Sequence, residues 1–286
     1  MTSLAFDYRR PDSVDQALAL LAEADPGTKV LAGGHSLLPI MKTRLAQPGR
    51  LIDIGHLGEL RGVHRLGDGG LSIGALTTYS RLLANPAITV YGLLADVLPT
   101  IGDVQVRNRG TIGGAVAHVD PAADLPACLL ALDAEVVVRS ARGGRTIALT
   151  SFFEGAFNSV LLPDELITEI RLPAASGDYG SAYRAQEQPA SGYALAGAAV
   201  VIGRSTGGGG RFDRAAIGIT GVGECPYRAS AVEQEFLSSG DPAAAAAHAT
   251  DGVLVASDIH ADREYRTALI RVQVRRALEA AIERVG

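Results

Sequence analysis

The chain has 286 residues, with 26 Lys and Arg against 31 Asp and Glu, which gives a formal net charge of −5. A hydrophobic content of 47% excludes a disordered chain, and the absence of a Lys/Arg block leaves no electrostatic footprint for nucleic acid or an anionic membrane. The two cysteines, Cys128 and Cys225, are too few to ligate an iron–sulfur cluster and lack CxxC spacing.

The N-terminal residues lack the apolar stretch of a signal peptide, and the longest apolar run, at 193–202, is about half of what spans a bilayer. We therefore expect a cytoplasmic protein without a transmembrane segment.

The first 56 residues predict a small α/β subdomain. Ser13 is the expected N-cap of a helix whose apolar residues recur at helical spacing up to Asp25. Strands are expected at 29–32 and 51–54, with a helix at 37–45 between them.

Residues 57–175 predict a second α/β subdomain. The expected elements are strands at 71–75, 135–138 and 166–172, a helix capped by Thr77 or Thr78 that runs to Leu83, a helix at 88–98, and an apolar helical run that ends at Leu132.

The expected linker lies at 174–178, and a different pattern of elements follows it in residues 176–286. Two longer strands, at 193–202 and 212–220, are separated by a glycine-rich hairpin tip at 206–210. Three helices are expected after them, at 229–237, 242–254 and 263–285. The last helix carries five arginines, which indicate a solvated face or a docking surface for a neighbouring subunit.

Two glycine pairs are the strongest candidates for a ligand site. Gly33 and Gly34 follow an expected strand and precede an expected helix, and Gly113 and Gly114 follow the hydroxyl residue Thr111. Glycine allows a sharp turn and a close approach of the backbone to a ligand, and free N–H groups at a helix start favour an anion. Two such turns predict a dinucleotide-like ligand whose diphosphate is held from both sides. The alternative is a pair of ordinary tight turns, since neither segment is a GxGxxG or P-loop motif.

A series of ordered motifs adds a resemblance to a known family. The motifs are AGGHSLLP at 32–39, LIDI at 51–54, IGA at 73–75, RNRGTIGG at 107–114, DPAAD at 120–124, PDELI at 163–167 and ITGVG at 219–223. With them the chain resembles, over essentially its whole length, the FAD-binding medium subunit of molybdenum hydroxylases. This family includes aerobic carbon monoxide dehydrogenase and xanthine dehydrogenase.

The resemblance implies an α+β fold of the vanillyl-alcohol oxidase (PCMH) type. Two α/β subdomains, 1–56 and 57–175, would hold FAD, and an α+β domain of antiparallel strands and helices at 176–286 would lie beside them. The implied function is electron transfer from the [2Fe–2S] clusters of a small partner subunit through FAD to a terminal acceptor. A large partner subunit would carry the molybdenum cofactor, in a dimer of heterotrimers. No catalytic or metal-ligating residue is expected in this chain.

The resemblance also assigns the residues that would meet FAD. Backbone amides would contact the diphosphate in two segments, namely Ala32, Gly33, Gly34, His35 and Ser36, and Thr111, Ile112, Gly113, Gly114 and Ala115. Asp124 would accept hydrogen bonds from the ribityl or ribose hydroxyls, Ile167 would line the flavin or adenine pocket, and Tyr193 would lie near the isoalloxazine ring.

Two other functional classes remain as alternatives. One is a stand-alone flavin oxidase or reductase of the same fold, which the short region after the linker disfavours because it leaves little chain for a substrate-binding cap. The other is a binding module without FAD, which leaves the two glycine pairs unexplained.

Residues 185–193 bear on the substrate branch within the family. They lack the basic run of the carbon monoxide dehydrogenase subunits and resemble the heteroaromatic-substrate branch more closely.

Overall fold

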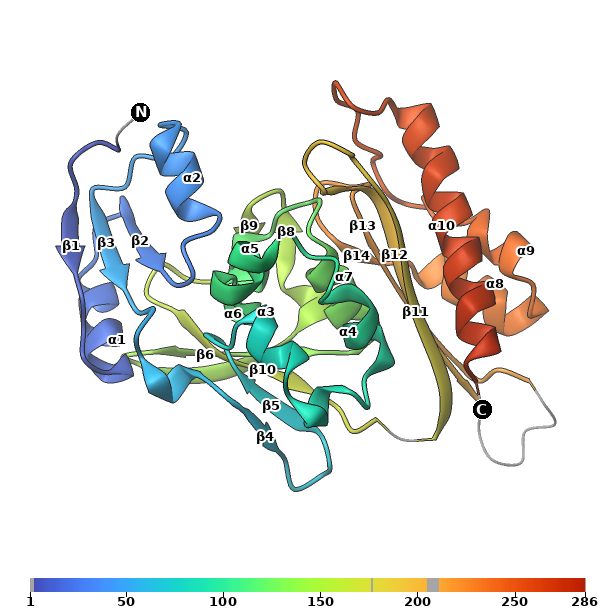
Figure 1. Ribbon diagram of the computed structural model, residues 1–286, viewed down its shortest axis with the longest axis horizontal. Coiled ribbons are helices and arrows are strands. Elements are labelled where there is room, and N and C mark those ends of the chain that lie inside the picture. Colours follow the sequence, from blue (N-terminus) through green and yellow to red (C-terminus); the bar gives the residue numbers. More distant parts are fainter. Residues whose placement is uncertain (1–2, 176, 205–210, 286) are drawn as a thin grey trace.

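The computed structural model describes residues 3–175, 177–204 and 211–285. Ser176 of the expected linker and the expected glycine-rich tip therefore lie outside the described residues. Figure 1 shows three regions side by side in chain order, with the N-terminal strands at one end and the longest helix at the other. In the part of the chain that is described, no helix is long and apolar enough to cross a membrane.

The N-terminal region is a parallel sheet flanked by two helices. The strands, in the order β1-β3-β2, are β1 (Asp7–Arg9), β2 (Thr28–Leu31) and β3 (Arg50–Asp53). Helix α1 (Val14–Ala22) begins as predicted, because the Ser13 hydroxyl accepts the amide of Gln16 at 3.2 Å. Helix α2 (Leu37–Lys42) ends earlier than predicted, because Arg44 adopts a positive φ of 63° that a helix cannot continue through.

The central region is built on an antiparallel sheet in the order β4-β5-β10-β6-β7. Its strands are β4 (Val63–Arg65), β5 (Leu71–Gly74), β6 (Glu135–Ser140), β7 (Gly143–Ala148) and β10 (Leu166–Leu172). A small separate hairpin is formed by β8 (Phe153–Gly155) and β9 (Asn158–Ser159).

Five helices lie in the central region; one of them begins later than predicted, and two of them, at 104–109 and 112–118, were not predicted. The helices are α3 (Tyr79–Leu83), α4 (Gly92–Val97), α5 (Val104–Arg109), α6 (Ile112–His118) and α7 (Asp124–Ala131), and the short 3₁₀ turns are η1 (Gly58–Leu60), η2 (Pro86–Ile88) and η3 (Leu149–Ser151). The helix expected at 88–98 begins only at Gly92, because Asn85 caps the separate turn η2 before it. Helix α6 was not predicted, since its two glycines have low helix propensity. The second glycine pair is thus the first turn of a helix and not a tight turn between elements.

The C-terminal region is a four-stranded antiparallel sheet with three helices on its outer face (Figure 1). The strands are β11 (Asp178–Glu187), β12 (Ala194–Arg204), β13 (Arg214–Thr220) and β14 (Tyr227–Arg228), and the helices are α8 (Ser230–Ser239), α9 (Pro242–Ala246) and α10 (Arg263–Glu283). Helix α9 is shorter than the predicted span 242–254, because residues 247–252 form turns that end at Gly252, where φ is 74°.

The C-terminal sheet is buried on both faces. On β12, Val200 and Ile202 join the core formed with α10, whereas Ala199 and Val201 join the core of the central region. Helix α7 covers this second face, and its backbone approaches β13 so closely that a Cβ atom on Gly218 would overlap the carbonyl oxygen of Ala127. Since sheet residues alternate between faces, one strand contributes to two cores. Helix α7 therefore contributes to the burial of this second face.

Candidate functional site

The first glycine segment follows the edge strand β2 at the point where that strand ends. Gly34 adopts a φ of 79°, a conformation that only glycine reaches without strain. Within the described parts of the chain, the amide N–H groups from Gly33 to Ser36 donate to no protein acceptor. Successive unengaged N–H groups form a concave donor surface that suits an anion. The contact of Ala32, Gly33, Gly34, His35 and Ser36 with a diphosphate stays a prediction.

The second segment presents a different situation, because its amides are already engaged. Thr111 is the N-cap of α6, and its hydroxyl accepts the amide of Gly114 at 3.2 Å. The amides of Ile112, Gly113 and Ala115 also donate to protein carbonyls, which are Thr77 O at 3.1 Å, Ala75 O at 2.9 Å and Thr111 O at 3.0 Å. The helix start is thus held by its own protein surroundings.

The two glycines of the second segment have separate reasons to be glycine. A Cβ atom on Gly113 would lie 2.5 Å from the Cβ of Ala75, so this residue is small because the protein itself is packed against it. A Cβ atom on Gly114 would meet only the Thr111 side chain. The built atom would lie 2.7 Å from the Thr111 hydroxyl oxygen, so glycine at this position also preserves the N-cap. Among the described residues beyond its own helix and chain neighbours, no atom outside the Thr111 side chain lies within 4 Å of the built Cβ atom.

The tertiary structure brings the two segments into contact. A Cβ atom on Gly33 would overlap the carbonyl oxygen of Arg109 and lie 3.3 Å from Gly110 Cα. Arg109 and Gly110 immediately precede Thr111. The two glycine segments therefore lie next to each other, with unengaged amides in the first and engaged amides in the second.

Asp124 is the first residue of α7 and is half-buried. Its carboxylate accepts a hydrogen bond from the hydroxyl of Tyr183, which lies on β11 of the C-terminal sheet. Burial raises the pKa of Asp124 from 3.8 to about 6; the hydrogen bond from Tyr183 lowers this pKa, and the charge of Glu187 raises it further. At neutral pH the group is a carboxylate able to accept from ligand hydroxyls.

This raised pKa predicts a specific pH dependence of stability. A carboxyl group with a higher pKa in the folded than in the unfolded state stabilises the fold below its unfolded pKa, and this contribution is lost as the pH rises through the folded value. We expect the unfolding free energy of the apoprotein, relative to that of the Asp124→Asn variant, to fall between about pH 4 and pH 6 and to be flat above. Urea unfolding at several pH values measures it, and a constant difference across that window would contradict the prediction.

Tyr193 precedes β12, and half of its surface (51%) is exposed. Partial burial raises the pKa of its phenol, and the carboxylates of Asp120 and Asp124 raise it further. The ring thus lies within electrostatic reach of Asp124, as does buried Tyr79, whose pKa is raised by burial and by Asp124 and Tyr193. The expected position of Tyr193 near the isoalloxazine ring stays a prediction.

The remaining predicted residues lie at the edge of the site or in the core. His35 is exposed, with Nδ1 3.3 Å from the carbonyl oxygen of Gly33, and it has no companions at metal-binding spacing. Ile167 is 5% exposed and belongs to the core of the central region, on β10. Within the described residues, no group of three or more His, Cys, Asp and Glu side chains is placed to hold a metal ion.

Sequence reasoning assigned no role to Tyr183, which the structure places at the site. Its side chain is 7% exposed and stands in a strand among alanines. A buried tyrosine hydroxyl needs a hydrogen-bond partner. This requirement was the one indication in the sequence that Tyr183 makes a specific polar contact. Its partner could not be identified, because Asp124 lies 59 positions away in the sequence.

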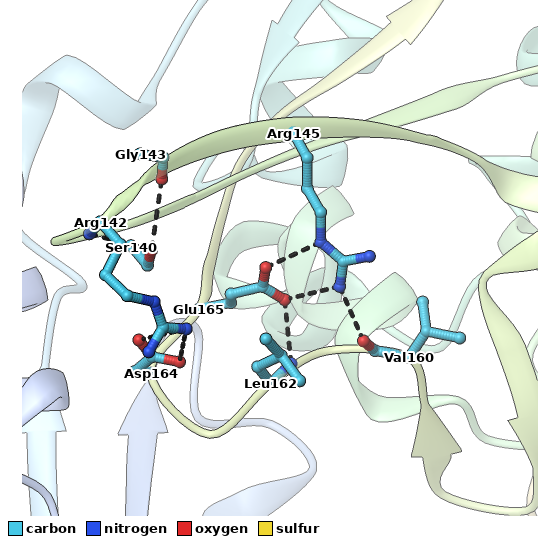
Figure 2. Close-up of polar contacts among 8 residues, drawn as sticks. All are labelled: Ser140, Arg142, Gly143, Arg145, Val160, Leu162, Asp164 and Glu165. Atoms are coloured by element: carbon cyan, nitrogen blue, oxygen red, sulfur yellow. Dashed lines mark hydrogen bonds and ion pairs between the residues drawn. The ribbon is translucent and has the colours of Figure 1, made fainter.

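The PDELI motif has a structural explanation. Figure 2 shows Glu165 accepting from Arg145 Nε and Nη2, both at 2.8 Å, and from the amide of Leu162 at 2.9 Å. Asp164 pairs with Arg142 at 3.0 Å. The pKa of Glu165 is lowered, chiefly by its hydrogen bond from Arg145. These pairs hold the β6–β7 hairpin against the loop before β10, so the role of this motif is structural. Both carboxylates beside the surface hollow at this hairpin are paired with an arginine.

Comparison with known families was made over the whole chain. Residues 4–175 match the family described as "FAD binding domain in molybdopterin dehydrogenase", and residues 181–281 match "CO dehydrogenase flavoprotein C-terminal domain". Together these two matches account for nearly all of the described residues.

Individual relatives are similar over nearly their full length. The carbon monoxide dehydrogenase medium chain of Hydrogenophaga pseudoflava is 38% identical, over 96% of this chain and 96% of the relative. The 6-hydroxypseudooxynicotine dehydrogenase complex subunit alpha of Paenarthrobacter nicotinovorans is also 38% identical, over 98% and 95%. A solved chain of carbon monoxide dehydrogenase from H. pseudoflava superposes with a TM-score of 0.95 at 40% identity, and the match covers 100% of both chains.

Proposed function

Because the chain belongs to the family of FAD-binding medium subunits of molybdenum hydroxylases, we propose that it binds FAD where residues 32–36 meet the start of α6 and the start of α7. It is an oxidoreductase subunit that carries FAD within a heteromeric complex. The observation that carries the proposed site is the run of unengaged amide N–H groups from Gly33 to Ser36, in contact with the residues before Thr111.

The residues of this chain bind and orient the cofactor. The amides of Gly33 to Ser36 donate to the diphosphate, and Gly114, which has no Cβ atom, leaves room for the same group beside the start of α6. The Asp124 carboxylate accepts from the hydroxyls of the ribityl or ribose part, and Tyr193 covers the ring system. Thr111, Ile112, Gly113 and Ala115 hold the start of α6 in position, and Ile167 supports the pocket wall from the core.

FAD, when bound, supplies the ability to take electrons singly and to release them as a pair, which suits a carrier between one-electron centres and a two-electron acceptor. The protein's contribution is to fix the position of the cofactor and to keep the Asp124 carboxylate facing it. No side chain of this chain is required to act as a general acid or base in that task.

We infer that the partners are a large subunit with the molybdenum cofactor and a small subunit with two [2Fe–2S] clusters, arranged as a dimer of heterotrimers in the cytoplasm. The names of the relatives support this assembly, since they are a "medium chain" and a "complex subunit alpha". The substrate would be bound by the large subunit. The carbon monoxide relative and the nicotine-related relative have the same identity of 38%, so both substrate classes remain to be assayed on the intact complex.

We also propose domain boundaries at 56/57 and 175/176. Supporting this division, the strands of the N-terminal sheet lie within 1–56, those of the central sheet within 57–175 and the described strands of the C-terminal sheet within 176–286. The core that α7 shares with the C-terminal sheet crosses the second of these boundaries.

The proposed function is tested by purifying the full chain and measuring its flavin content. We expect a yellow protein that carries about one FAD per chain, released on denaturation, because a single site is built. A folded but colourless chain that takes up no added FAD would refute the proposal. Isolation from its host without molybdenum and iron–sulfur partners would instead support a stand-alone flavin oxidase.

A further inference from the structure

We propose that Tyr183 is a positioning residue of the FAD site, whose buried hydroxyl orients the Asp124 carboxylate toward the cofactor. Through this contact the C-terminal sheet would control a group on α7 of the FAD-binding region. The proposal rests on the proposed function, because Asp124 is taken to accept from FAD hydroxyls.

The first support is the burial of the hydroxyl itself. Tyr183 is 7% exposed, and among the described residues its hydroxyl donates only to Asp124 Oδ1. A buried hydroxyl without a partner is costly, so the pair constrains both side chains. Asp124 uses Oδ1 for this bond, and no other residue in the described part of the chain donates to its second oxygen, which can therefore accept from a ligand.

The second support is the space made for the hydroxyl on the neighbouring strand. Tyr183 pairs with Ala199 across β11 and β12, and Gly197 lies diagonally beside it, two residues before Ala199. A Cβ atom on Gly197 would lie 2.5 Å from the Tyr183 hydroxyl oxygen. Glycine at this position therefore permits the observed direction of the tyrosine side chain.

The third support is that the C-terminal sheet also holds the main chain next to Asp124. The buried Thr220 hydroxyl lies 2.9 Å from Pro121 O and 2.8 Å from Ala123 O, and the amide of Gly221 donates to Pro121 O at 2.8 Å. Arg266 of α10 in turn donates to the carbonyl of Gly221 at 2.6 Å. The sheet thus fixes the backbone that leads into α7, and Tyr183 fixes the side chain at its start.

The effect of the Tyr183 hydroxyl on Asp124 has to be compared with that of the other charged and titratable groups around this carboxylate. The groups that face it from the neighbouring elements are Glu187 and Tyr183 on β11, Asp120 before α7, Cys128 on α7, Tyr79 on α3 and Tyr193 before β12. The charges of Glu187 and Asp120 disfavour the Asp124 carboxylate, whereas the Tyr183 hydrogen bond favours it. Burial is the main cause of the raised pKa of Asp124; the hydrogen bond from Tyr183 opposes this rise and holds one carboxylate oxygen in place.

The test compares the Tyr183→Phe variant with a matched Tyr179→Phe control in the full chain. Tyr179 lies on the same strand and the same face, and its hydroxyl donates to the backbone carbonyl of Val90. The first measurement is the titration of the Asp124 carboxyl in the apoprotein by carbon-13 NMR, with Asp124→Asn identifying the signal. We expect the midpoint to rise in Tyr183→Phe and to stay unchanged in Tyr179→Phe.

The second measurement is the dissociation constant of FAD as a function of pH. We expect Tyr183→Phe to bind FAD about tenfold more weakly at pH 7, the effect of losing one hydrogen bond, and to show the onset of weakening at higher pH than the wild type. Gly197→Ala, which displaces the hydroxyl without removing it, should weaken binding in the same direction. The FAD affinity of this variant tests the same positioning role if Tyr183→Phe fails to fold.

The outcomes separate the two proposals. A Tyr183→Phe variant with unchanged Asp124 titration and unchanged FAD affinity would overturn the positioning role. A wild type that binds FAD no more tightly than Asp124→Asn would overturn the assigned contact of Asp124, and a wild type that binds no FAD would overturn the proposed function itself.

Discussion

Replacing Gly33 with alanine is expected to weaken FAD binding by about 100-fold, the loss of one or two charge-assisted hydrogen bonds. A Cβ atom here would overlap the carbonyl oxygen of Arg109 and lie 2.9 Å from its carbonyl carbon. Both atoms are backbone, held by α5 and the start of α6, so the glycine segment would have to move away. That movement would misalign the amide donors of Gly33 to Ser36. Fluorescence titration of the apoprotein with FAD measures the change.

Gly58→Ala is the matched control for this experiment. Gly58 lies in the turn η1, has nothing within 4 Å of its built Cβ atom and needs no positive φ. We expect its FAD affinity and its stability to equal those of the wild type. A Gly33→Ala variant that also binds FAD with wild-type affinity would show that residues 32–36 do not hold the diphosphate.

Replacing Gly218 with alanine is expected to lower the free energy of unfolding by about 3 kcal/mol, at the upper end for overpacking a close backbone contact. The added Cβ atom would overlap the carbonyl oxygen of Ala127 and lie 2.8 Å from its carbonyl carbon. Helix α7 would therefore be pushed off β13, which opens the core shared by the central and C-terminal regions. Urea unfolding followed by circular dichroism gives the value.

This second variant should also weaken FAD binding, because α7 begins with Asp124. The control is Gly155→Ala, a strand glycine on β8 whose built Cβ meets only Glu224 Oε2, at 3.8 Å. We expect it to change the unfolding free energy by less than about 0.5 kcal/mol. Equal stability of Gly218→Ala and Gly155→Ala would mean that α7 does not depend on direct backbone contact with β13.

The predicted N-cap of α1 was confirmed, whereas the predicted bounds of α2, α4 and α9 were wrong. Ser13 caps α1 as expected, since an N-cap side chain bonds to an amide two or three residues ahead. The family was also readable from ordered motifs, because their residue types and spacing are properties of the chain itself. Local patterns failed where a helix runs through unfavourable residues, as in α6, whose Gly113 and Gly114 argued for a turn.

The sequence by itself thus determined the family and the mixed α and β elements. Only the tertiary structure decided that the amides of Ile112 to Ala115 are already engaged, that Gly33 touches Arg109, and that Tyr183 holds Asp124. The physical reason is the range of the interactions. A cap or a strand pattern is encoded within a few residues, whereas a hydrogen-bond acceptor or a close backbone contact is supplied by segments that meet only when sheets and helices come together.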